Sequence, residues 1–230
     1  MPNRNLELLT TAAQLLRPIL DELVFVGGCA TGLLITDEAA AEVRPTFDVD
    51  AIVEITSYSD YANFSERLRI LGFTEDTSED APICRWSHGE TKLDVMPLDE
   101  KILGFSNRWY KPAMDSSEKH ILDNDLRIRV VTAPYFCATK LEAFEGRGKD
   151  DYFSSHDLED LVSVIDGRSE LLPELQGAPQ DVRSFIASTV ARMLDSNQFI
   201  DALPGYLLPD AISQSRISVL LKRLGDIAKL

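Results

Sequence analysis

Three aspartates occupy positions where their side chains could act together. Asp48 and Asp50 stand one residue apart in the stretch FDVDAIV, and Asp94 stands in LDVMP. Because successive side chains of a strand point to opposite faces, Asp48 and Asp50 share one face while Phe47 and Val49 share the other, the core face. Neighbouring carboxylates repel one another unless a cation lies between them, and Mg²⁺ prefers oxygen ligands. The spacing therefore predicts a divalent metal site, with a solvated strand face as the alternative.

Two glycines precede these aspartates at the end of a short apolar run. Gly27 and Gly28 follow VFV and open a helical pattern over residues 28–36. Small residues at a strand-to-helix turn let the backbone approach a phosphate group, and a helix amino terminus offers unpaired N–H groups. We therefore expect a phosphate-binding turn at the same edge of the sheet as the carboxylates.

Apolar periodicity predicts a mixed α/β half followed by a helical half. The elements expected in the first half are a helix over 5–22, a strand at 24–26, a helix over 28–36, a strand at 47–54, a helix from Ser57 or Ser59 to 71, strands at 83–88 and 91–96 joined by the tight turn HGE, and extended pieces at 119–122 and 126–131 joined by DND. The second half is expected to be a bundle of helices at 133–146, 155–167, 179–198 and 211–229. The predicted domains are 1–131 and 132–230.

Composition limits the function classes. The 230 residues include 23 Lys and Arg against 38 Asp and Glu, a net charge of -15, which argues against a broad basic surface for nucleic acid. A phosphate-bearing substrate would need local cations. The chain has no apolar stretch of the ~18 residues typical of a membrane span, and its amino terminus lacks the continuous apolar region of a signal peptide. Its three cysteines are far apart, so we expect a cytoplasmic protein without a membrane anchor.

The motifs resemble those of the nucleotidyltransferases of the DNA polymerase β type. That signature is an apolar residue and two small residues opening a helix, then Asp-x-Asp on the next strand and a third Asp on a later strand; here these are VGG, FDVDAIV and LDV. The gap between the glycines and the aspartates is longer here than in most of that superfamily. This gap, the lead-in RPTFDVD and the stretch ATKLEAFEGRGKDDYFSSHDLEDLVSVID resemble more closely the AbiEii and MenT group, often toxins of toxin-antitoxin pairs. The resemblance spans residues 24–166. It implies a mixed-sheet nucleotidyltransferase fold followed by an α-helical bundle.

The resemblance also suggests roles for charged residues of the second half. In that group a lysine on its first helix contacts the nucleotide's phosphates and an aspartate opening the next helix is needed for activity, which here match Lys140 and Asp157. The alternatives are a solvated helix lysine and a carboxylate that interacts with the helix dipole. Arg44, Arg147 and Lys149 are further candidates for phosphate contacts, each with a solvated surface charge as the alternative.

Taken together, the resemblance implies a metal-dependent transfer of an NMP from an NTP to an acceptor hydroxyl. Mg²⁺ or Mn²⁺ ions would be held by the three aspartates, and the two glycines with Lys140 would bind the β and γ phosphates. The acceptor stays open among a tRNA 3′ end or other RNA, a protein and a small molecule. The resemblance also suggests an antitoxin protein as a partner, whose existence the sequence leaves open. The alternatives are a non-catalytic interaction protein that retains the fold and a metal-dependent phosphohydrolase.

Overall fold

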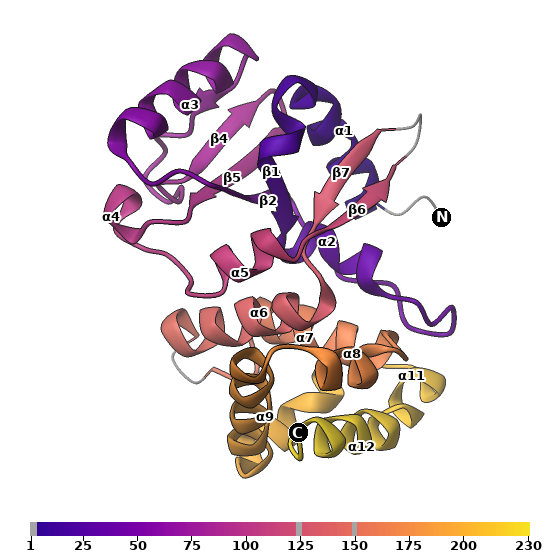
Figure 1. The fold of residues 1–230 in the computed structure, drawn as a ribbon. Helices are drawn as coiled ribbons and strands as arrows, with labels where there is room; N and C mark the ends of the chain where they lie inside the picture. The colour runs from indigo at the N-terminus through magenta and orange to yellow at the C-terminus, as the bar shows by residue number, and fades with distance from the viewer. Residues whose placement is uncertain (1–3, 123–125, 149–150) are drawn as a thin grey trace. The chain divides into compact units, whose positions relative to one another are not determined.

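A computed structural model describes residues 4–122, 126–148 and 151–230 of the chain. Its chain divides into two compact units (Figure 1), which we call the sheet unit, Met1–Ala30 with Pro45–Thr132, and the helical unit, Thr31–Arg44 with Ala133–Leu230. The predicted domain ranges differ from these units at the segment Thr31–Arg44, which joins the helical unit, and at Thr132, which belongs to the sheet unit. The predicted turn DND, at residues 123–125, lies outside the described residues.

Within the described residues, the sheet unit contains a seven-stranded mixed sheet of order β3-β4-β5-β2-β1-β7-β6 (Figure 1). The strands are β1 Leu23–Val26, β2 Asp48–Val53, β3 Thr74–Glu75, β4 Arg85–His88, β5 Thr91–Pro97, β6 Glu118–Ile121 and β7 Arg127–Val130. Strand β2 pairs in parallel with β5 and antiparallel with β1, while β1 pairs in parallel with β7. The neighbours β3 and β4, β4 and β5, and β6 and β7 are antiparallel.

The first residues of β2 follow the predicted alternation. Val49 is fully buried, whereas Asp48 and Asp50 are partly exposed, so the two carboxylates share the opposite face, as predicted. The expectation for Phe47 is wrong, because this residue precedes the strand and is 65% exposed. The guanidinium of Arg4 lies over its ring at 5.1 Å, which gives the exposed aromatic side chain a partner.

Helices and a 3₁₀ helix accompany the sheet. They are α1 Arg4–Leu15, η1 Arg17–Glu22, α2 Gly27–Leu34, α3 Tyr58–Ile70, α4 Glu100–Leu103 and α5 Tyr110–Asp115. The predicted helix over 5–22 is divided near Pro18, whose ring nitrogen carries no N–H to continue the α-helical bonding. Helix α3 begins after Ser57, whose hydroxyl accepts the backbone N–H of Asp60 at 3.1 Å, so Ser57 is the cap of the two predicted candidates.

The helical unit is built from short and medium helices. They are α6 Ala133–Arg147, α7 His156–Gly167, α8 Leu171–Gly177, α9 Gln180–Leu194, α10 Asn197–Ala202, η3 Leu203–Tyr206, α11 Ala211–Ser215 and α12 Ile217–Ile227. The predicted helices over 179–198 and 211–229 are each interrupted, the first after Leu194 and the second at Arg216. Among the residues that the structure describes, no helix combines the length and apolar character needed to cross a membrane.

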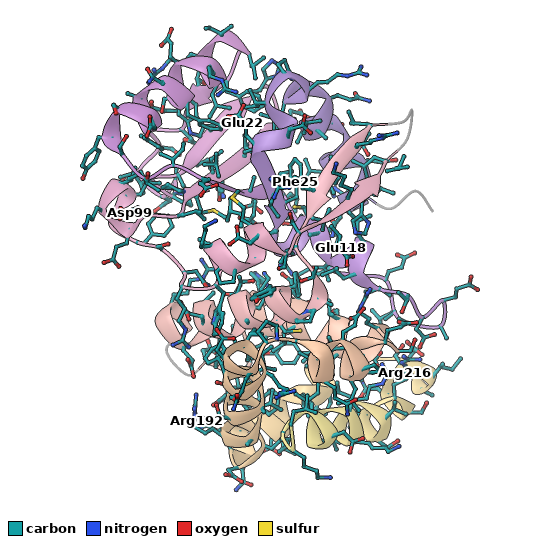
Figure 2. All side chains as sticks on the ribbon, viewed as in Figure 1. Glu22, Phe25, Asp99, Glu118, Arg192 and Arg216 are labelled. Atoms are coloured by element: carbon teal, nitrogen blue, oxygen red, sulfur yellow. The ribbon has the colours of Figure 1, made fainter. Side chains whose placement is uncertain are left out.

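Hydrogen bonds tie the segment Thr31–Arg44 to the rest of the helical unit. The backbone N–H groups of Thr36 and Asp37 both donate to the carbonyl of Gly167 at 2.9 Å. Arg216, labelled in Figure 2, bridges the Asp37 carboxylate at 2.8 Å and the Asp166 carboxylate at 2.7 Å. The fold class is as predicted. A mixed sheet with accompanying helices forms most of the first half of the chain, and helices form the second half.

Candidate functional site

The pairing of β2 with β5 brings the three predicted aspartates to one region of the sheet. In this parallel pair Asp50 lies opposite Asp94, and Asp48 lies opposite Lys92. Asp94 is buried, whereas the two aspartates of β2 are partly exposed. The sheet unit therefore gathers all three carboxylates onto adjacent strands.

An arginine from the next strand lies between two of these carboxylates. Arg85 of β4 is opposite Asp94 in the antiparallel β4–β5 pair. Its Nε donates to Asp94 Oδ1 at 2.7 Å and its Nη2 to Asp94 Oδ2 at 2.7 Å. The same Nη2 donates to Asp48 Oδ2 at 2.5 Å. One guanidinium therefore holds Asp94 through two parallel bonds and Asp48 through a third.

Burial makes this charge pairing necessary. The Arg85 side chain is 14% exposed and that of Asp94 is 8% exposed, so an unpaired charge at either position would be poorly hydrated. The hydrogen bonds to Asp94, followed by the nearby negative charges, raise the pKa of the Arg85 guanidinium above its ordinary value. Arg85 is therefore a permanent cation at this position.

A short chain of hydrogen bonds supports Asp48 from the side of α1. Thr46 Oγ1 donates to Asp48 Oδ1 at 2.9 Å, and the backbone N–H of Thr46 donates to Asn5 Oδ1 at 2.9 Å. Asn5 and Thr46 are both buried, and α1 contacts β2 and β5. The residues before β2 are thereby held so that one Asp48 oxygen faces Thr46 and the other faces Arg85.

Asp50 lies against the turn that opens α2. Gly27 has a φ of +67°, and a Cβ built on it would lie 1.9 Å from Asp50 Oδ2. Glycine is therefore required here both by the left-handed backbone and by the closeness of the carboxylate. The partial positive charge of a helix amino terminus stabilises a nearby carboxylate. Gly28 follows in the first turn of α2, and a phosphate-binding role of the two glycines stays a prediction.

Lys140 is a buried ion-pair partner in the helical unit. Its Nζ donates to Asp160 Oδ2 at 2.7 Å and to Asp157 Oδ1 at 3.2 Å. Lys140 is 8% exposed, so the alternative of a solvated helix lysine is wrong. The two carboxylates are also buried, and they come from the first turns of α7, which packs against α6.

The two predicted arginines of the helical unit bind the same part of α7. Arg147 donates to Asp157 through Nε and Nη2, both at 3.0 Å. Arg44 lies 3.2 Å from Glu159 through Nε and 3.4 Å from Asp160 through Nη2. Arg44, Lys140 and Arg147 therefore each have a carboxylate partner within their own unit. Lys149, the remaining candidate cation, lies outside the described residues.

The donor chemistry of the sheet unit suits a divalent cation, but the side chains do not stand as a three-ligand metal site. Asp48 and Asp94 converge on one cationic atom, the Nη2 of Arg85, while Asp50 lies against Gly27. Over residues 4–122, 126–148 and 151–230, no group of three or more His, Cys, Asp or Glu side chains is arranged to hold a metal ion.

Sequence reasoning missed three residues of this site: Arg85, Thr46 and Asn5. A signal for Arg85 was available, because a tight turn at HGE pairs His88 with Thr91 and, three residues further along each strand, Arg85 with Asp94. Asn5 had no comparable signal, since its bond to Thr46 joins residues 41 positions apart in the chain.

Comparison with known proteins places the fold. Neither a protein-family model nor a curated protein sequence matches the chain. Among solved structures, an antigenic nucleotidyltransferase-like protein from Paracoccidioides brasiliensis matches with 17% identity and a TM-score of 0.50, covering 87% of this chain and 94% of that one. JHP933 from Helicobacter pylori matches with 14% identity and a TM-score of 0.46, covering 97% of this chain and 90% of that one. The first similarity shows that this chain has a nucleotidyltransferase-like fold.

Proposed function

We propose that the protein is a nucleotidyltransferase that moves an NMP from an NTP to an acceptor hydroxyl. The observation that carries this proposal is the gathering of three carboxylates on adjacent strands of a nucleotidyltransferase-like fold, with Asp50 directly opposite Asp94. Neighbouring carboxylates on one face repel one another, and Arg85 offsets the charge of Asp48 and Asp94, so this region has the charge arrangement of a cation site.

Each group of the sheet unit has a proposed task in this reaction. Asp48, Asp50 and Asp94 would bind Mg²⁺ or Mn²⁺, which would neutralise triphosphate charge and lower the pKa of the acceptor hydroxyl. A carboxylate oxygen of Asp94 would accept the proton of that hydroxyl. The backbone N–H groups at Gly27 and Gly28 would donate to phosphate oxygens.

The remaining parts of the proposal come from residue charge or from the resemblance to the AbiEii and MenT group. Arg44 and Arg147 are proposed as phosphate contacts because of their charge and position. The resemblance assigns Lys140 to the nucleotide's phosphates and Asp157 to activity. It also suggests an acceptor among RNA, such as a tRNA 3′ end, protein and small molecules, and an antitoxin protein as a partner. The proposed cytoplasmic location comes from the three widely spaced cysteines. The ion pairs of Lys140 and Arg147 with carboxylates of α7 neither require nor oppose the roles proposed for these two residues.

A transfer assay tests the proposal. The purified protein is incubated with each NTP labelled at the α-phosphate, Mg²⁺ or Mn²⁺, and either total RNA or a protein extract. We expect label in one acceptor fraction together with pyrophosphate release, and at least about a hundredfold loss in Asp50→Asn. The matched control is Glu54→Gln, an exposed carboxylate just beyond the other end of β2, which should keep full activity.

Two other outcomes would contradict the proposal. Release of inorganic phosphate without label transfer would identify a phosphohydrolase. Absence of NTP turnover and of any NTP-induced rise in melting temperature would favour the non-catalytic interaction protein, since a ligand that binds only the native state must stabilise it.

A further inference from the structure

The guanidinium of Arg85 lies where a cation shared by Asp48 and Asp94 would lie. Its Nη2 is 2.5 Å from Asp48 Oδ2 and 2.7 Å from Asp94 Oδ2, so oxygens from two different strands converge on one nitrogen atom. Convergence of carboxylates from neighbouring strands is the arrangement expected around a bound metal ion. Here this chain supplies the positive charge itself.

The backbone keeps Arg85 at this place. Arg85 and Asp94 are cross-strand partners in β4 and β5, and Asp94 and Asp50 are cross-strand partners in β5 and β2. The sheet hydrogen bonds therefore position the arginine and two of the aspartates in one row. Because the Arg85 and Asp94 side chains are largely buried, separating them would leave both charges without their partner.

A divalent ion and this guanidinium cannot use the same oxygens together. Mg²⁺ takes carboxylate oxygens at about 2.0–2.1 Å and would repel a second cation at so short a distance. Asp94 offers both of its oxygens to Arg85, and Asp48 offers one to Arg85 and the other to Thr46. All four oxygens of these two aspartates thus already have a protein donor.

From this juxtaposition we propose that Arg85 competes with the divalent metal ion for Asp48 and Asp94, so that metal binding requires the guanidinium to leave both carboxylates. The inference rests on the proposed function, because it assumes that these aspartates are metal ligands. Arg85 then sets the apparent metal affinity, since a site open in only a fraction of molecules binds more weakly by that fraction. In the metal-free protein the same arginine stabilises the sheet by neutralising the aspartates.

Metal affinity measured without substrate tests the competition. Mn²⁺ binding is followed by the electron paramagnetic resonance signal of the free ion, for the wild type, Arg85→Gln and Arg69→Gln. We expect Arg85→Gln to bind Mn²⁺ at least about tenfold more tightly, and to melt at a lower temperature than the wild type when no metal is present. The control, Arg69, pairs with Glu66 and Glu75 at the surface of the same unit, so its loss should leave the Mn²⁺ affinity unchanged.

Each other outcome has a distinct meaning. Equal affinity in the wild type and Arg85→Gln, with binding lost in Asp48→Asn, would overturn the competition and leave the metal site and the proposed function standing. Absence of Mn²⁺ binding in all variants would overturn the competition together with the metal chemistry of the proposed function. Weaker binding in Arg85→Gln would also overturn it, since the arginine would then support the ion.

A second variant keeps the test decisive if Arg85→Gln does not fold. Arg85→Lys retains a positive charge but replaces the two-pronged guanidinium by one ammonium group, which cannot hold both aspartates in the same way. We expect Mn²⁺ to bind this variant at least about threefold more tightly than the wild type. An unchanged dissociation constant in Arg85→Lys would overturn the competition.

Discussion

At the scale of single residues, buried cations of both units are held by carboxylate partners. Arg85 joins Asp48 and Asp94 in the sheet unit, and Lys140 joins Asp157 and Asp160 in the helical unit. The sequence identified Lys140 and Asp157 as candidate functional residues. Their pairing was not predictable, because it depends on how α6 and α7 pack against each other.

The burial of Lys140 leads to a prediction about stability. Lys140→Met removes an ammonium group from between two buried carboxylates, which should lower the free energy of unfolding by about 3 kcal/mol. Arg147→Met removes a cation from the same Asp157, but the Arg147 side chain is 74% exposed, so the loss should stay below about 1 kcal/mol. Urea unfolding followed by circular dichroism measures both values. Similar losses in the two variants would show that burial does not strengthen the Lys140 pairs.

At the scale of secondary structure, local patterns predicted most elements of the sheet but not all of their pairings. The β4–β5 register follows from the tight turn at Gly89, which has a φ of +59°. The register of the parallel pair β2 and β5 could not be derived from a turn, because α3 and two strands lie between them in the chain. The sequence therefore shows that the aspartates share a face, whereas the structure is needed to show that Asp50 lies beside Asp94.

The turn that opens α2 gives a prediction at this scale. An alanine in a left-handed conformation costs about 1–2 kcal/mol, and this strain alone should apply to Gly89→Ala, where a Cβ meets nothing within 4 Å. Gly27→Ala should lower the free energy of unfolding by at least about twice as much as Gly89→Ala, because its Cβ would also collide with the Asp50 carboxylate. Thermal unfolding of the two variants, which lie in the same unit, measures the difference. Equal losses would mean that Asp50 moves aside without cost.

At the scale of the whole molecule, the chain contributes two separate segments to each unit. The helical unit contains Thr31–Arg44, whose two ends continue into α2 and β2. Its contacts with Gly167 and Arg216 join residues more than a hundred positions apart, so no local pattern could assign this segment. Because elements of the sheet unit restrain both ends of the segment, unfolding of that unit would release a closed loop and raise its conformational entropy.

Each unit contains a buried cysteine that can report on this coupling. Burial raises the pKa of the thiol to about 12 for Cys84 in the sheet unit and to about 12 for Cys137 in the helical unit. A thiol in the unfolded chain has a pKa of about 8.5. Above that pH the unfolded state can ionise while the folded state cannot, so the folded state loses stability as the pH rises. At pH 8 both buried thiols therefore stay protonated, and the thiolate is the reactive form.

We therefore expect both thiols to react with a disulfide reagent at pH 8 only after their own unit opens. In a Cys29→Ala background, which removes the third buried cysteine, labelled peptides separate the Cys84 signal from the Cys137 signal. Unfolding of the sheet unit frees both ends of Thr31–Arg44 and so destabilises the helical unit. The labelling of Cys84 and that of Cys137, each followed against urea concentration, should therefore have midpoints within about 0.5 M of each other. The control is the fully denatured protein, in which both thiols should react at once and at similar rates. Labelling of Cys84 at a clearly lower urea concentration than Cys137 would show that the helical unit keeps its fold without the restraint on its inserted segment.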